Sequence, residues 1–198
     1  MNPDELLTTT RSVRRRLDLD RPVSLDLVKE CLRIALQAPT GSNAQRWRWL
    51  VIAHPDQRAA IAEFYLRAWT EYAASSQTKE QRLVDSATHL ARNLGRVPVL
   101  VIPCLELASA DLPDGNQAGL WGSLLPAAWS YALAARSRGL GTAWTTLHLR
   151  YEREVGELLG LPARVRQGVL LPTAHTIGDS FKPAGRRPLD EVLHVDRW

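Results

Sequence analysis

The stretch Ala38-Pro39-Thr40-Gly41-Ser42-Asn43-Ala44-Gln45-Arg46-Trp47 lies between a helical hydrophobic pattern and a strand that begins at Trp47. Pro39 is expected to end the helix, and Gly41 to adopt a positive φ in the turn. Asn43 and Gln45 each offer one acceptor and two donors, which suits the edge of a planar ring bearing C=O and N–H groups. Because these residue types also dominate ordinary turns, the stretch taken alone is equally consistent with a polar surface turn.

The length and charge of the chain limit its class. With 198 residues, it is expected to form one domain, residues 1–198, with a sizeable core. The net charge of +4 is mildly basic. The arginines gather in two clusters, Arg11–Arg16 and Arg186–Arg187, without a nucleic-acid-binding motif. This pattern favours an anionic small molecule over nucleic acid as the partner.

Cysteine usage and hydropathy indicate a cytoplasmic protein. Cys31 and Cys104 lie in apolar segments, with no CxxC motif and no metal-ligand spacing, so both are interpreted as buried side chains in a reducing compartment and no metal is expected. The N-terminus carries Asp4 and Glu5 and no apolar signal region. The most apolar run, residues 120–135, is too short to cross a bilayer.

Hydrophobic periodicity predicts an α+β fold, because pairs of helices separate the strands. Helices are expected over residues 2–10, 24–38, 56–74, 78–94, 119–138 and 152–159, and strands over 47–53, 97–105, 142–147 and 165–174. Thr78 is the expected cap of the fourth helix. Helix 119–138 is apolar on most of its circumference, which suggests a dimer interface, and Pro126 is expected to kink it. Loop 106–118 is either a lid or a surface connection.

Four motifs resemble those of the FMN-dependent nitroreductase family. They are Thr10-Arg11-Ser12-Val13-Arg14, the stretch at 38–47, Gly139-Leu140-Gly141 and Arg186-Arg187-Pro188-Leu189. Their order and spacing match the family over about residues 8–198. Two positions depart from the family pattern: Thr10 stands where an arginine is frequent, and Arg46 where a proline is frequent.

The resemblance implies a nitroreductase-like central mixed or antiparallel sheet flanked by helices. It also implies a homodimer that exchanges a C-terminal arm, about residues 177–198, with one FMN at each interface. A guanidinium fork can hold two phosphate oxygens at once. The expected phosphate-binding residues are Arg11, Ser12, Val13, Arg14, Arg15, Arg186 and Arg187. Arg11, Ser12 and Arg186 are favoured among them, whereas Arg15, Arg16 and Arg21 are more simply explained as solvated charges.

The flavin ring is expected to meet two further segments. By resemblance, the ring and ribityl chain contact the partner subunit's turn, and the redox nitrogen N5 lies near a second loop. The turn residues are Pro39, Thr40, Gly41, Asn43 and Gln45, and the loop residues are Thr145, Thr146 and Leu147. Trp121, Trp129 and Trp144 could line the flavin cavity, although packing in the core or interface is the simpler explanation for each.

The resemblance implies ping-pong reduction of nitroaromatics, quinones or similar electron-poor substrates, with NADH or NADPH as co-substrate. Hydride moves through the flavin, so no catalytic protein residue is required. His148 is the one histidine considered as a proton donor. Two alternatives remain open. The same fold could carry out dehalogenation or flavin breakdown, or the chain could be a non-enzymatic basic binding protein whose affinity falls steeply with salt.

Overall fold

The computed structural model describes residues 1–75 and 80–198. The helices are α1 (Pro3–Thr9), α2 (Leu25–Ala35), α3 (Pro55–Ser75), α4 (Gln81–Asn93), α5 (Ala118–Arg136) and α6 (Glu152–Leu158). The strands are β1 (Trp47–Ile52), β2 (Val99–Glu106), β3 (Leu140–Thr142), β4 (Val165–Gln167) and β5 (Leu171–His175). Short 3₁₀ turns are η1 (Gly41–Asn43), η2 (Leu94–Arg96), η3 (Leu147–Tyr151) and η4 (Leu189–Glu191). The predicted α+β class is confirmed.

The sheet is built around β2. Strand β1 pairs antiparallel with one edge of β2, while β4 and β5 pair with successive parts of its other edge. Strand β3 then pairs antiparallel with β5. Every ladder between named strands is antiparallel, and the one parallel contact in the described part of the chain is an isolated bridge between Ser12 and Thr142.

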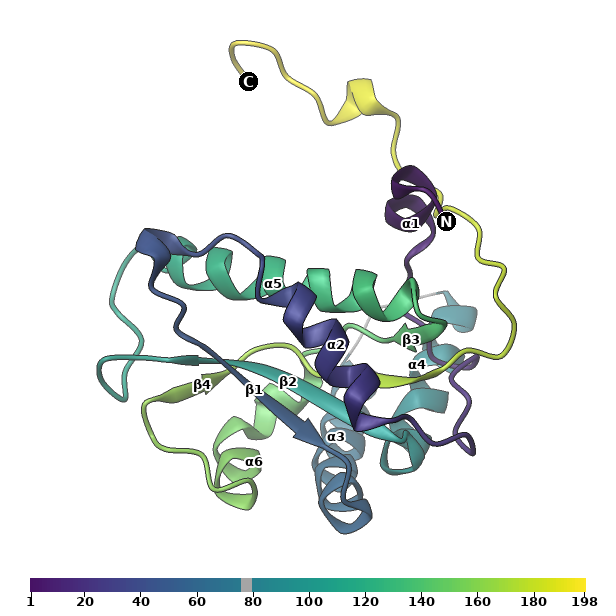
Figure 1. The fold of residues 1–198 in the computed structure, drawn as a ribbon, viewed down its shortest axis with the longest axis vertical. Coiled ribbons are helices and arrows are strands. Elements are labelled where there is room, and N and C mark those ends of the chain that lie inside the picture. Colours follow the sequence, from purple (N-terminus) through teal and green to yellow (C-terminus); the bar gives the residue numbers. More distant parts are fainter. Residues whose placement is uncertain (76–79) are drawn as a thin grey trace.

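Helices cover both faces of the sheet (Figure 1). Alternating side chains of β2 pack against the helices on the two faces. Val99 and Val101 pack with α2 and α5 on one face. Leu100 and Ile102 pack with α3, α4 and α6 on the other face. Because both faces are covered, β2 is apolar from Val99 to Leu105, as an interior strand must be.

Local capping explains the starts of α1 and α2. The backbone N–H of Glu5 donates to Asn2 Oδ1 at 2.8 Å, and that of Asp26 donates to Ser24 Oγ at 3.2 Å. Both helices therefore begin next to residues 2 and 24, where the sequence predicts their starts. Helix α4 begins at Gln81, and Thr78, its predicted cap, lies outside the described residues.

Two strand predictions are wrong at their boundaries. Instead of the strand expected at 142–147, the chain forms the shorter strand β3, Leu140–Thr142. It leaves the sheet after Thr142. The expected strand at 165–174 divides into β4 and β5. Between them, the Gly168 N–H donates to the Pro103 carbonyl oxygen at 2.8 Å. Pro103 has no N–H to return, so a regular ladder cannot continue there.

Helix α5 is buried mainly on one side. Leu124, Ala128 and Tyr131 are fully buried, whereas Trp129 keeps 37% of its surface exposed. The predicted all-round burial is therefore only partial within one chain. Pro126 lies inside a helix that continues on both sides of it.

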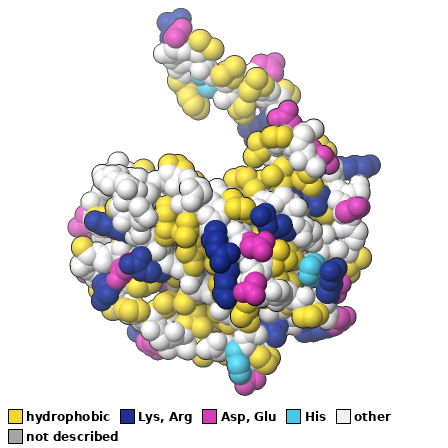
Figure 2. All heavy atoms as spheres, viewed as in Figure 1, with side chains coloured by type: hydrophobic (Ala, Val, Ile, Leu, Met, Phe, Trp, Pro, Cys, Tyr) yellow, Lys and Arg dark blue, Asp and Glu magenta, His cyan; other side chains and the backbone are white. Residues whose placement is uncertain are grey.

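The last segment leaves the body as an extended arm. Its base is fixed by Phe181, whose ring lies between the guanidinium groups of Arg16 and Arg136, at 4.1 and 4.4 Å from its centroid. Arg16 also donates to the carbonyl oxygens of Ile177 and Ser180, so its interpretation as a solvated charge is wrong. Beyond this base the arm extends away from the body, and Figure 2 shows its apolar side chains uncovered.

Candidate functional site

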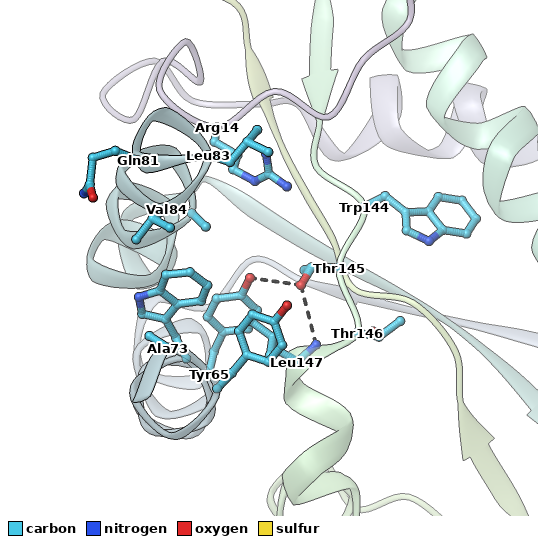
Figure 3. Close-up of a pocket in the computed structure, with 13 residues that line it drawn as sticks. Arg14, Tyr65, Ala73, Gln81, Leu83, Val84, Trp144, Thr145, Thr146 and Leu147 are labelled. Carbon is cyan, nitrogen blue, oxygen red and sulfur yellow. Dashed lines mark hydrogen bonds between the residues drawn. The ribbon is translucent and has the colours of Figure 1, made fainter. Parts of the chain in front are cut away.

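A cavity of about 630 Å³ opens between the α3–α4 pair and the loop that follows β3 (Figure 3). Among the described residues, its walls are largely aromatic and aliphatic, with one cation, Arg14. The lining residues are Arg14, Tyr65, Trp69, Tyr72, Ala73, Gln81, Leu83, Val84, Ala87, Trp144, Thr145, Thr146 and Leu147. Its size falls within the range of about 300–1,000 Å³ typical of small-molecule sites.

Residues 144–147 form the cavity loop, and backbone hydrogen bonds fix its position. The Trp144 N–H donates to Ser12 Oγ at 2.9 Å. Thr145 exchanges backbone hydrogen bonds with Leu170, at 3.2 and 2.8 Å. Two residues before the cavity loop, the Thr142 carbonyl oxygen accepts the Val13 N–H at 2.8 Å. These bonds place the first arginine cluster beside the cavity loop.

A pair of hydroxyl groups connects the cavity loop to α3. Tyr65 Oη lies 2.9 Å from Thr145 Oγ1, and the Leu147 N–H points to the same oxygen at 3.5 Å. Burial raises the pKa of Tyr65, and this effect is opposed in part by the Thr145 hydrogen bond and the charge of Arg14. Tyr65 therefore keeps its proton at neutral pH.

Arg14 supplies positive charge to the cavity. Among the described residues it makes no ion pair with an acidic side chain, whereas Arg48, Arg164 and Arg166 are paired with glutamates. An unpaired guanidinium beside aromatic walls can hold an anionic group of a ligand that is otherwise flat and apolar.

Most of the other residues predicted to bind the phosphate do not line this cavity within one chain. Arg11 is exposed and donates to the Lys182 carbonyl oxygen at 3.0 Å. Val13 is buried in the core, and Arg15 is exposed. Arg186 and Arg187 lie on the exposed arm, where Arg186 donates to the Gly185 carbonyl oxygen. One chain therefore brings Ser12 and Arg14 to the cavity loop but does not bring Arg186 or Arg187 there.

The stretch at 38–46, here named the polar turn, has a different backbone from the one predicted. Gly41 does not have a positive φ; Ser42, Asn43 and Gln45 do, at 52°, 53° and 48°. The expectation for Gly41 is wrong because its N–H donates to Ser123 Oγ at 3.0 Å on α5, and the left-handed residues follow it. Non-glycine residues with a left-handed backbone conformation are strained, and such strain is common at binding sites.

The polar turn does not line the aromatic cavity in the described chain. It borders a separate hollow of about 280 Å³, with the first turns of α5 on its other side. It lies at the start of α5, while β3 and the cavity loop follow the end of that helix (Figure 1). Within the turn, Gln45 Nε2 donates to Asn43 Oδ1 at 2.9 Å, so the two amides that were predicted to meet a ring meet each other.

His148 is fully buried and is not among the residues that line the cavity. Neither ring nitrogen has a hydrogen-bond partner among the described residues. Burial lowers its pKa to about 3, so the imidazole is neutral at physiological pH. The geometry does not favour a role for this side chain as a proton donor to substrate.

The cavity walls formed by α3 and α4 were not predicted from the sequence. Tyr65 and Leu83 fit the apolar stripes of their helices, so they read as ordinary core residues. Periodicity cannot show that Trp69 and Tyr72 face an opening rather than a neighbour. Of the three candidate cavity tryptophans, Trp144 lines the cavity; Trp129 packs against Trp144 at 6.3 Å between ring centroids. Trp121 instead donates its Nε1–H to Gln117 Oε1.

Loop 107–117 borders other hollows of the surface. Ala110 and Asp111 line a polar hollow beside α6, and Asn116 lines the hollow at the polar turn. Within residues 1–75 and 80–198, no helix is long and apolar enough to cross a membrane. The same residues contain no His, Cys, Asp or Glu group arranged to hold a metal ion.

Comparison with known proteins assigns the chain to a family. The family model described as "Nitroreductase family" matches residues 7–175, so the chain belongs to the nitroreductase family. The resemblance inferred from the four motifs and the predicted fold class are confirmed; exchange of the C-terminal arm stays a prediction.

Individual relatives differ in the activity that their names describe. An iodotyrosine deiodinase of Thermotoga neapolitana is 26% identical over 94% of this chain and 94% of its own length. A crystal structure of oxidized iodotyrosine deiodinase bound to FMN and 3-iodo-L-tyrosine superposes with a TM-score of 0.78, at 22% identity, covering 98% of this chain and 99% of that one. An FMN and NADPH-dependent nitroreductase from sphigopyxis sp. strain HMH has a TM-score of 0.75 at 20% identity, with both chains fully covered.

Proposed function

We propose that the protein is an FMN-dependent oxidoreductase that takes hydride from NADH or NADPH and reduces nitroaromatics, quinones or similar electron-poor aromatics. The observation that carries this proposal is the aromatic cavity with Arg14 at its edge and Ser12 bonded to its loop. FMN is a flat ring system joined through a ribityl chain to a phosphate, so it needs a flat, largely apolar wall and a cation. The cavity therefore offers the two kinds of surface that the cofactor needs.

The residues present fit FMN. Arg14 has no acidic partner among the described residues and lines the cavity. Ser12 Oγ accepts the Trp144 N–H, which leaves its own hydrogen free to donate to an anion. Arg11 lies on the same short segment and is exposed. FMN supplies the hydride chemistry when bound, while these side chains hold the phosphate and the aromatic walls position the ring.

A second copy of the chain completes this proposed site. The polar turn and Arg186–Arg187 are both exposed and both lie away from the cavity of their own chain. Exchange of the arm across a homodimer would present them to the partner's cavity. Pro39, Thr40, Gly41, Asn43 and Gln45 would then face the ring, and Thr145, Thr146 and Leu147 would lie near N5.

A second candidate function is reductive dehalogenation of an aromatic substrate. It is favoured by the likeness to proteins named iodotyrosine deiodinase, in sequence and in structure. Trp69 and Tyr72 could stack on a halogenated ring as readily as on a nitroaromatic one. The basic-binding-protein alternative has less support, because several arginines are paired with acids rather than free for a polyanion.

Titration of the purified apo-protein with FMN tests the cofactor. Arg14→Ala should weaken binding by about 1.5–3 kcal/mol, the range for a hydrogen bond to a charged group, or roughly 10- to 100-fold. Arg33→Ala, at an exposed arginine on α2, is the matched control and should bind as the parent does. Failure of the parent to bind FMN would overturn the proposal.

The two candidate activities separate in one assay with the FMN-loaded protein. A nitroaromatic and a halogenated phenol are offered in parallel, with NADH, NADPH or dithionite as the reductant. Oxidation of NADH or NADPH coupled to reduction of the nitro group to a hydroxylamine or amine supports the first function. Halide release, with little nitroaromatic turnover, supports the second.

A further inference from the structure

The polar hollow beside α6, here named the α6 hollow, is a second cavity that the proposed function does not use. It has a volume of about 690 Å³ and lies between loop 107–117, η3, α6 and β4. None of its described lining residues also lines the aromatic cavity. Figure 1 shows β4 and α6 toward the left of the molecule and β3, which leads into the cavity loop, toward the right. The two cavities are therefore separate.

Gln167 lies at the bottom of the α6 hollow, because it belongs to the lining and yet is only 2% exposed. Its Nε2 donates to the Glu152 carbonyl oxygen at 2.7 Å, and its backbone N–H donates to Glu152 Oε1 at 2.9 Å. Turning the amide over would place Oε1 against that carbonyl oxygen, so the hydrogen bond determines the orientation of the amide. Gln167 Oε1 is then left without a hydrogen-bond partner among the described residues.

The neighbouring residue of β4, Arg166, contributes an unused donor to the same lining. Its Nη2 donates to Glu152 Oε2 at 2.6 Å, whereas its buried Nε has no partner in the described part of the chain. Both carboxylate oxygens of Glu152 are already engaged, one by Arg166 and one by the Gln167 backbone. Because buried polar atoms are nearly always bonded to protein, water or ligand, one acceptor and one donor here require an occupant of the hollow.

Gly156 keeps the space beside Gln167 open. It lies inside α6 with a φ that is not positive, at a position where alanine would favour the helix more than glycine does. A Cβ at this position would lie 3.6 Å from Gln167 Nε2, which is an ordinary contact. Packing therefore does not require glycine here. A longer side chain would extend into the hollow, since Gly156 is part of its lining.

We propose that the α6 hollow is a binding site for a neutral small molecule that carries a carboxamide. This group offers an N–H to Gln167 Oε1 and a carbonyl oxygen to the Arg166 Nε–H within one plane. A carboxylate has no hydrogen for Gln167 Oε1, and an ammonium has no acceptor for Arg166, so either would leave one buried atom unpaired. The described lining also carries three arginines and four acidic side chains, a near balance that gives little preference for a charged ligand.

An NMR titration of the full-length protein with propionamide tests this site. The side-chain amide resonances of Gln167 should shift saturably, with a dissociation constant on the order of 1–10 mM for so small a ligand. The amides of Gln45 and Gln81, both exposed, are internal controls and should not move. Propionate and propylammonium have nearly the same size and should bind at least about tenfold more weakly.

Two variants at Gly156 locate the binding. Gly156→Leu should abolish the propionamide shift while the Gln167 resonances persist, because leucine fills the hollow and removes no atom of the site. Gly156→Ala is the matched control and should bind as the parent does, since its methyl group makes only an ordinary contact.

Three results would contradict the inference. No saturable shift with propionamide would mean that water alone satisfies the two buried atoms. Equal or tighter binding of propionate or propylammonium would mean that charge, rather than the amide, is recognised. Undiminished binding in Gly156→Leu would place the ligand elsewhere. These measurements need no FMN, so failure of this inference leaves the proposed function standing, and the reverse also holds.

Discussion

The cavity loop and the polar turn are both predicted to touch one flavin ring, yet the fold secures them in different ways. The cavity loop is bonded to the N-terminal segment, to Leu170 and to Tyr65. The polar turn is exposed. Among the described residues, two hydrogen bonds join it to the sheet and α5, from the Gly41 N–H to Ser123 Oγ and from the Glu106 N–H to the Arg46 carbonyl oxygen, and further bonds lie within the turn. It also contains three left-handed non-glycine residues, each costing roughly 1–2 kcal/mol.

This difference shows that one chain prepares one side of the proposed site. The cavity loop needs no further contact to keep its shape. The polar turn keeps a strained backbone on the surface, where its own chain provides few stabilising contacts. A contact outside the chain would make that strain useful, and in the proposed dimer that contact is the partner's flavin.

Removing the arm should have the largest effect. A chain shortened after Lys182 keeps the Phe181 clamp but loses the exposed apolar residues Leu189, Val192 and Leu193. An obligate interface depends on such area, so sedimentation should show a monomer that no longer retains FMN. The double variant Asp190→Asn, Glu191→Gln, in the same exposed 3₁₀ turn, is the control and should stay dimeric. A shortened chain that dimerises and keeps its flavin would show that the two halves meet without the arm.

Adding one methyl group should separate the two regions by stability. At Gly141, beneath the cavity loop, a Cβ would lie 2.7 Å from Thr176 Cγ2 and 3.2 Å from Val13 Cβ. At Gly41 its nearest neighbour would be Ser123 Oγ, at 3.7 Å. Gly141→Ala should therefore lose about 1–3 kcal/mol of unfolding free energy, and Gly41→Ala close to none. Urea unfolding measures both, and equal losses would contradict the contrast between a packed loop and an open turn.

Lowering the pH should reduce the free energy of unfolding through protonation of His148 in the unfolded state. The folded pKa is about 3 and the ordinary value is 6.5, so the unfolded state binds the proton first. The unfolding free energy is therefore unaffected by His148 well above pH 6.5. It decreases as the pH falls below 6.5, by about 2 kcal/mol at pH 5 for this one group. His148→Phe should flatten the dependence of unfolding free energy between pH 5 and 6.5, whereas His54→Gln, at an exposed site, should not. An NMR titration showing His148 protonated in the folded protein near pH 6.5 would refute the assignment.

Glycine should have opposite effects in the turn and in an ordinary helix end. Ser42 has a φ of 52° and Ser137, at the C-cap of α5, a φ of −64°. Ser42→Gly should change the unfolding free energy by up to about 1 kcal/mol in the stabilising direction, because glycine accepts a left-handed conformation. Ser137→Gly should be destabilising by about 0.5–1 kcal/mol. Thermal unfolding of the two variants compares the signs; a loss at Ser42 would mean that its side chain, rather than its backbone, holds the turn.

The sequence by itself determined the features that depend on neighbours along the chain. The first two helices begin at Asn2 and Ser24 as predicted, and both residues cap them, since a cap needs a side-chain oxygen and an N–H two or three residues away. The order of the motifs predicted the family, and the unbroken apolar run from Val99 to Leu105 predicted an interior strand.

Tertiary structure alone decided the rest, because the deciding contacts join residues far apart in sequence. The end of β3 at Thr142, the break between β4 and β5 at Pro103, and the shift of positive φ from Gly41 to Ser42 each follow from a hydrogen bond across the fold. The same holds for Tyr65: its position in the α3 stripe marks it as apolar core, and only packing against the cavity loop places its hydroxyl on Thr145. Periodicity tells which face of a helix avoids water, but it cannot tell whether that face meets a neighbouring helix or a cavity, since both remove it from solvent.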